Sequence, residues 1–130
     1  NKKGVMIAQN PKNMAEVLDE ADFVISAAGG TALELSYLGL PMALIALAKN
    51  QIENAKAIDQ AGAGLYLGEA LKISDDDIAN GLKKLIEDDD RRQTCSINGL
   101  NLIDGLSHKR ISRHINQAWA LHQGSQEKLI

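Results

Sequence analysis

Two nearly continuous apolar runs, each followed by a segment with helical spacing, constrain the fold of this chain more than any other feature. The first run covers residues 23–28 and the second covers 42–48. Runs of this kind suit strands that are buried on both faces, as in a parallel sheet covered by helices. Because helix-like segments separate these runs, strands and helices alternate along the chain. The alternation is typical of an α/β layered fold with a parallel sheet.

Two shorter apolar segments extend the predicted sheet. Residues 5–8 precede the turn signal Asn10-Pro11, and residues 65–67 follow a glycine-rich turn, so we expect a strand at each. The sheet would then have about four strands, whereas a full nucleotide-binding unit of this type has about six. We therefore expect residues 1–130 to form a single domain that is a fragment of a two-domain protein and lacks its first strand–helix units. Residues 124–130 are expected to form a flexible tail.

Helices are predicted from apolar spacing and from the residues that begin them. The expected helical segments are 14–21, 31–38, 52–61, 74–86, 88–103 and 107–122. Carboxylates stabilise the positive end of the helix dipole, and serine is a preferred capping residue. We therefore expect helices to begin at Ser74 with the aspartate triplet 75–77, and at the aspartate triplet 88–90. In the last helix, four residues are expected to face the core: Ile111, Ile115, Ala118 and Trp119.

Composition and charge argue against several classes of function. The net charge of −3 disfavours a nucleic-acid-binding surface, because proteins bind the phosphate backbone through clustered lysine and arginine side chains. No apolar run approaches the roughly 18 residues that a membrane span requires. The single cysteine, Cys95, cannot form an internal disulfide, so we expect a cytoplasmic protein. His114 and His122 are too far apart to share a metal ion, and we expect neither a metal nor a cofactor.

The segment 26–34 carries the most chemical information. A buried strand ends there, Gly29 and Gly30 let the backbone turn, and a helix begins at Thr31. The free N–H groups of a first helical turn, together with the helix dipole, bind anions without any basic side chain. Ligands of open α/β sheets bind beyond the carboxyl ends of the strands, which is where this loop lies. The alternative is a strand–helix turn that merely needs flexible residues.

Glu34 has two interpretations. The spacing Thr31-x-x-Glu34 matches a capping box, in which both side chains satisfy backbone donors. The functional alternative is a carboxylate that accepts hydrogen bonds from both hydroxyls of a ribose. Such a carboxylate would repel phosphate, so Glu34 would face the sugar rather than the diphosphate.

A second polar cluster follows the second buried strand. Asn50 and Gln51 present amides, which suit a base edge with one acceptor and one N–H donor, such as uracil. Asn54 lies one helical turn after Asn50 and is expected to face the same crevice. The alternative is that Asn50 simply caps the helix. Neither the G-x-G-x-x-G fingerprint nor a P-loop is present, which argues against dinucleotide binding and ATP hydrolysis.

These motifs together resemble a known group of enzymes. Residues 22–34, Gly39-Leu40-Pro41 and Asn50-Gln51 resemble the C-terminal half of GT-B-fold enzymes, which implies a Rossmann-like parallel sheet with helices on both faces. Lys49-Asn50-Gln51 and the later Asp104-Gly105 and Arg110-Ile111 pairs are similar to the UDP-sugar hydrolase of pseudaminic acid synthesis and related spore-coat polysaccharide proteins (PseG/SpsG type). The Gly-Gly-Thr…Glu element is shared with glycosyltransferases of the MurG type.

The resemblance implies a UDP-sugar site and an activity. Gly29, Gly30 and Thr31 would hold the diphosphate and Glu34 the ribose. Asn50 and Gln51 would hold the base or the adjoining sugar. The implied reaction is hydrolysis of a UDP-linked 2,4-diacetamido-trideoxyhexose to the free sugar and UDP, without a metal. The catalytic residues are unknown, because the family's base lies in an N-terminal half that these residues do not include, so this chain alone is expected to be inactive.

Two other functions remain open at this point. The chain could be the donor-binding half of a GT-B glycosyltransferase that acts on a membrane-linked acceptor. It could also be a non-catalytic module that senses a nucleotide sugar or pairs with another chain. Transfer to an acceptor would distinguish the first from a hydrolase, and the absence of UDP binding would indicate a module that only pairs.

Overall fold

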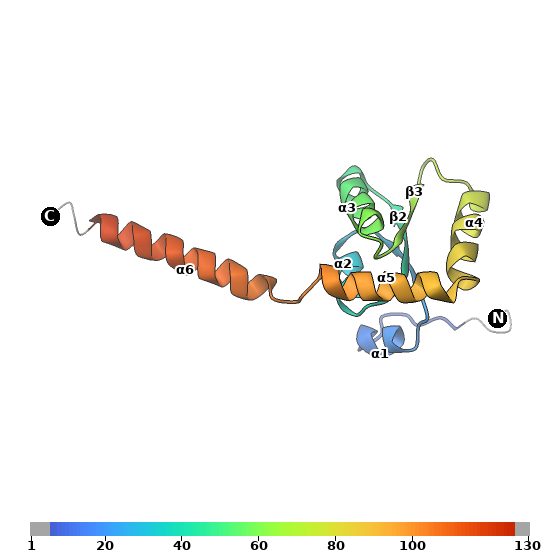
Figure 1. Ribbon diagram of the computed structural model, residues 1–130, viewed down its shortest axis with the longest axis horizontal. Helices are drawn as coiled ribbons and strands as arrows, with labels where there is room; N and C mark the ends of the chain where they lie inside the picture. The colour runs from blue at the N-terminus through green and yellow to red at the C-terminus, as the bar shows by residue number, and fades with distance from the viewer. Residues whose placement is uncertain (1–5, 127–130) are drawn as a thin grey trace.

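The computed structural model describes residues 6–126, and the side chains of residues 6–122. In chain order the elements are α1 (Met14–Asp19), β1 (Val24–Ala27), α2 (Gly30–Tyr37), β2 (Met42–Ala46), α3 (Lys49–Gln60), β3 (Leu65–Glu69), α4 (Asp75–Ile86), α5 (Asp89–Leu102) and α6 (Ser107–Gln126) (Figure 1). The alternation of strands and helices predicted from the two apolar runs is confirmed.

The three strands form a parallel sheet in the order β1-β2-β3. Val24 pairs with Met42, and Leu44 pairs with Tyr66. The register then shifts, because Ile45 pairs with Gly68 and leaves one extra residue in β3. Gly68 has a φ of +141°, a conformation that residues with a side chain rarely adopt. Helices flank this sheet, so the expected α/β class is confirmed, and the arrangement is that of a Rossmann-like C-terminal half of a GT-B fold.

The core lies between the sheet and helices α2 and α3. Its buried members come from both layers: Ala28, Ala32, Leu35, Met42, Leu44, Ala55, Ile58 and Ala63. β2 is the central strand, and four of its five residues are buried, as expected for its continuous apolar sequence. This core holds α2 and α3 against the sheet. Because α2 follows β1 and α3 follows β2, both helices begin at the carboxyl edge of the sheet.

Helices α4 and α5 begin at the predicted acidic caps. The side chain of Ser74 accepts from the N–H of Asp77, whose carboxylate accepts in return from the N–H of Ser74. The hydroxyl of Ser74 also donates to the carboxylate of Asp77 at 2.6 Å, and this bond, together with the one from the N–H of Ser74, lowers the pKa of Asp77. The side chain of Asp88 accepts from the N–H of Arg91 at 2.8 Å. The predicted capping role of both aspartate triplets is confirmed.

The expected strand at residues 5–8 is absent over the described residues 6–8 (Val5 lies outside them). Met6 and Ile7 are each 82% exposed and belong to no strand. The described residues therefore contain three strands rather than the expected four or so. An apolar tetrapeptide becomes a strand only when a neighbouring strand completes its backbone hydrogen bonds. Within residues 6–126, the strand that follows it, β1, pairs with β2 alone.

The last helix, α6, extends away from the other elements (Figure 1). Its four predicted core residues, Ile111, Ile115, Ala118 and Trp119, are all exposed, so that prediction is wrong. The turn before the helix explains its direction. The carboxylate of Asp104 accepts from the N–H of Leu106 and forms an ion pair with Arg110. Gly105, with a φ of +68°, lies against the ring of Tyr37.

Two further predictions concern the chain end and the membrane. The predicted tail at 124–130 overlaps α6 as far as Gln126, and residues 127–130 lie outside the described part. Within the described part, the structure has no helix with the length and apolar character needed to cross a bilayer.

Candidate functional site

Two strand–helix junctions lie side by side at the carboxyl edge of the sheet. β1 leads into α2 through Ala28 and Gly29, and β2 leads into α3 through Leu47 and Ala48. Because β1 and β2 are adjacent and parallel, both helices begin at the same edge. All seven predicted site residues lie at these junctions or in the helices that follow: Gly29, Gly30, Thr31, Glu34, Asn50, Gln51 and Asn54.

The amino end of α2 has no side-chain cap in the described structure. Gly29 is the capping residue, with φ −91° and ψ −153°, and Gly30 is the first helical residue. The alternative in which Thr31 and Glu34 form a capping box is therefore wrong, since Thr31 is the second residue of the helix. Glu34 is exposed. The first N–H groups of α2 are left without side-chain acceptors, which is the condition for binding an anion there.

The two glycines differ in what surrounds them. A side-chain carbon added to Gly29 would meet the amide nitrogen of Gln51 at 3.6 Å. A side-chain carbon added to Gly30 would meet no heavy atom of the described chain within 4 Å. The backbone at Gly30 is therefore open on the side where a side chain would project, whereas Gly29 lies against α3.

The amino end of α3 differs from the predicted one. Ala48 is its capping residue, so the alternative in which Asn50 caps the helix is wrong. Asn50 lies in the first turn and is exposed. The side-chain oxygen of Gln51 accepts a hydrogen bond from the N–H of Leu47 at 2.9 Å. Gln51 thus holds the end of β2, and only its amide nitrogen faces the other junction.

Asn54 connects the two junctions directly. Its side-chain nitrogen donates to the carbonyl oxygen of Ala28 at 2.8 Å, with a longer contact of 3.5 Å to that of Gly29. The side chain is half-buried. The structure therefore brings Gly29 together with Gln51 and Asn54, while Glu34 and Asn50 remain exposed on separate helices. Sequence spacing placed Asn54 at this edge, but its bond to the backbone of the glycine loop was not predicted.

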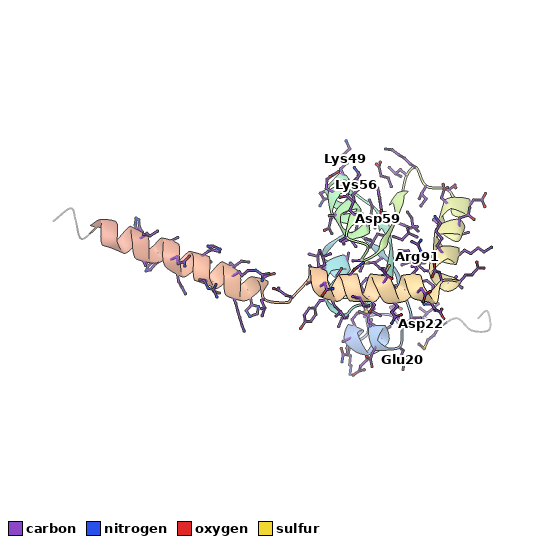
Figure 2. The ribbon with its side chains drawn as sticks, in the orientation of Figure 1. Glu20, Asp22, Lys49, Lys56, Asp59 and Arg91 are labelled. Atoms are coloured by element: carbon purple, nitrogen blue, oxygen red, sulfur yellow. The ribbon has the colours of Figure 1, made fainter. Side chains whose placement is uncertain are left out.

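A shallow hollow of about 170 Å³ adjoins the second junction, between the ends of β2 and β3. It is lined by Ala46, Leu47, Ala48, Lys49, Glu69, Ala70 and Leu71. Figure 2 shows Lys49 at the start of α3, with Lys56 and Asp59 further along the helix. Glu69, the last residue of β3, was not among the predicted site residues; its place just after the apolar segment 65–67 was the signal that could have indicated it.

Several charged side chains of α3 and β3 already have partners. Lys56 donates to Glu53 at 3.0 Å, which raises the pKa of Lys56. Glu69 accepts from Lys72 at 2.6 Å. Asp59 accepts from the N–H of Tyr66 at 3.2 Å and so ties α3 to β3. In the described residues, no three histidine, cysteine or acidic side chains are grouped so that they could hold a metal ion.

Cys95 and the three histidines lie away from this edge. Cys95 is a buried residue of α5, and burial raises the pKa of its thiol, so it is a packing residue. His108, His114 and His122 are exposed on α6. A larger hollow of about 470 Å³ lies elsewhere, between α1 and the segment containing Leu38 and Leu40.

Known proteins share sequence with part of this chain. UDP-glucuronosyltransferase 1A6 of Oryctolagus cuniculus is 44% identical over 50 residues, which is 38% of this chain and 9% of that protein. UDP-glucuronosyltransferase 1A4 of the same organism matches to the same extent. The matched part of the chain thus spans only 9% of the length of each of these relatives.

A family model matches most of the chain. It describes the glycosyltransferase family 28 C-terminal domain and covers residues 1–110. This match confirms the expected C-terminal half of a GT-B enzyme and contradicts the expected hydrolase activity, because the family and both relatives are glycosyltransferases. The motifs shared with the MurG type indicated the correct family, whereas the Asn-Gln and Asp-Gly elements led to the wrong activity. The chain belongs to the family of glycosyltransferase family 28 C-terminal domains.

Proposed function

We propose that this chain is the donor-binding half of a glycosyltransferase that uses a UDP-linked sugar. Its membership of the family 28 C-terminal domains carries the proposal. The two relatives named as UDP-glucuronosyltransferases support uridine diphosphate as the carrier of the sugar. In this proposal an N-terminal partner domain supplies the acceptor side of the active site and the group that moves the proton.

The diphosphate binds at the amino end of α2. Gly29, Gly30 and Thr31 offer backbone N–H groups there, and the helix has no side-chain cap in the described structure. The helix dipole adds partial positive charge at the same point. The open space at Gly30 lets phosphate oxygens approach the backbone closely.

Glu34 accepts hydrogen bonds from the ribose hydroxyls. It lies four residues after Gly30 and three after Thr31, so it shares a helix face with both. Its side chain is exposed and takes no part in a capping box. A carboxylate repels phosphate and accepts well from paired hydroxyls, so the ribose is its suitable partner.

The base or the adjoining sugar lies along the start of α3. Asn50 is exposed there, and its amide offers one acceptor and two donors. Gln51 contributes only its amide nitrogen, because its oxygen is engaged by the N–H of Leu47. Lys49 adds a positive charge in the same turn, beside the hollow at the ends of β2 and β3.

The proposed reaction transfers a glycosyl group from UDP to an acceptor hydroxyl. The acceptor oxygen attacks the anomeric carbon, the bond between that carbon and the diphosphate breaks, and UDP leaves with the bonding electron pair. The hydroxyl proton passes to a base in the partner domain. Negative charge grows on the diphosphate as the bond breaks, and N–H groups aimed at it lower the barrier.

Titration of the chain with UDP, followed by the backbone amide signals, tests the binding step. We expect the largest shifts at Gly29, Gly30 and Thr31, and none at Asn80 on α4. Unchanged signals at the three loop residues would contradict the proposal.

A second measurement tests the reaction with the partner domain present. A labelled UDP-sugar should be consumed only when an acceptor is added, with one UDP released for each product formed. Release of free sugar at the same rate without an acceptor would contradict the transferase assignment.

A further inference from the structure

We propose that Asn54 is a positioning residue that sets the orientation of the diphosphate-binding loop; this inference rests on the proposed function. Its spacing from Asn50 predicts an amide that faces the ligand crevice. In the structure that amide is directed at the backbone of the β1–α2 junction, where it donates to the carbonyl oxygen of Ala28 at 2.8 Å.

This hydrogen bond also sets the direction of the N–H of Gly29, because the peptide group is planar. In a planar trans peptide, the carbonyl oxygen and the following N–H point in opposite directions. Asn54 holds the carbonyl of Ala28 toward α3, so the N–H of Gly29 is turned away from α3. That N–H belongs to the loop proposed to hold the diphosphate.

The next peptide group is held in the same way. The carbonyl oxygen of Gly29 accepts from the N–H of Ala32 at 3.1 Å and lies 3.5 Å from the amide nitrogen of Asn54. These contacts direct the N–H of Gly30 out of the amino end of α2. Two successive N–H groups are thereby fixed before any ligand arrives, which lowers the entropic cost of binding.

Asn54 is well suited to hold the loop in this way. Glycine loses more conformational freedom on folding than any other residue, so the pair Gly29-Gly30 gains most from an external restraint. Asn54 projects from α3, whose neighbours Ala55 and Ile58 are fully packed in the core. The restraint is therefore anchored on a rigid helix and not on a second loop.

Replacement of Asn54 with leucine tests this role, because leucine is similar in size and donates no hydrogen bond. We expect the Kd for UDP to rise roughly tenfold, while the Kd for uridine, which has no phosphate, stays unchanged. The amide signals of Gly29 and Gly30 in the free protein should shift or broaden. The matched control is Asn80→Leu, which removes an exposed amide on α4 and should change neither Kd.

The possible results separate this inference from the proposed function. If the parent chain does not bind UDP, the proposed function fails. If the parent binds UDP and Asn54→Leu binds it equally well, only the positioning role fails. An equal loss of affinity for UDP and uridine would assign Asn54 to the base and overturn the inference.

Two further variants cover the case in which Asn54→Leu does not fold. Asn54→Ser keeps one shorter donor and should give a UDP affinity below that of the parent with uridine affinity retained. Asn54→Gln keeps the amide on a longer side chain, and partial recovery of UDP affinity relative to the serine variant would support the role of the amide donor. If Asn54→Ser bound UDP as tightly as the parent, and Asn54→Gln bound it no more tightly than Asn54→Ser, the role of the amide donor would be contradicted.

Discussion

Replacing Glu34 with glutamine separates folding from binding at the proposed ribose site. Glu34 is exposed in the middle of α2 and caps no helix end. Glutamate and glutamine have similar helix propensities. The free energy of unfolding should therefore change by less than about 0.5 kcal/mol, the usual range for exposed positions.

The same substitution should weaken UDP binding. The carboxylate would accept charged hydrogen bonds from the ribose hydroxyls, and loss of such a bond costs about 1–3 kcal/mol. At 1.4 kcal/mol for each tenfold change, the Kd should rise about 5- to 150-fold. Isothermal titration calorimetry measures this rise, and urea unfolding measures stability. The control is Glu87→Gln, an exposed glutamate whose carboxylate lies 3.7 Å from Lys83.

A comparison of UDP with 2′-deoxyuridine diphosphate identifies the group that Glu34 binds. The parent should bind the deoxy analogue more weakly, and Glu34→Gln should then weaken its binding further only slightly. A coupling of at least about 0.5 kcal/mol between the substitution and the hydroxyl is expected for groups in contact. Purely additive effects would refute the reasoning, as would equal UDP affinity in the variant and the parent.

Three further predictions concern stability, titration and exposure. Gly99→Ala should lower the free energy of unfolding in urea by about 1 kcal/mol. The new side-chain carbon would lie 3.0 Å from the carbonyl oxygen of Ser36, and this overpacking outweighs the gain in helix propensity. An increase in stability would contradict this packing. The pKa of Asp104 is lowered from 3.8 to about 2 by hydrogen bonds from Arg110, so its stabilising effect is present above pH 3.8 and is lost as the pH falls through 2. A carbon-detected NMR titration should give that midpoint, and Arg110→Gln should raise it; a midpoint unaffected by the substitution would exclude the ion pair. Trp119, the single tryptophan, is 63% exposed and should be quenched by acrylamide almost as efficiently as free tryptophan, whereas strong protection would show that α6 packs against another surface.

Local sequence patterns predicted the sheet and the location of the candidate site. The runs at 23–28 and 42–48 contain β1 and β2, because short apolar runs bounded by turn residues favour strands that are covered on both faces. The helix beginnings at Ser74 and Asp88 were also predicted, since capping depends on residues within one turn of each other.

The errors arose where an element depends on a neighbour. Residues 6–8 have the composition of a strand but no partner strand in the described structure. The apolar side of α6 has helical spacing, yet the turn at Asp104 and Gly105 directs that helix away from the core. Thr31 matched a capping pattern, but the helix starts one residue earlier at Gly30. Local spacing cannot report any of these three outcomes.

The local residue pattern was enough to predict that a glycine loop joins a buried strand to a helix, because an apolar run followed by paired glycines favours that local structure. It also determined which amides follow the next strand. The roles of those amides depend on the packed fold, since parallel pairing of β1 with β2 brings the side-chain nitrogen of Asn54 within 2.8 Å of a carbonyl oxygen 26 residues away. Hydrogen bonds between distant segments depend on how helices pack on the sheet, and no local pattern contains that information.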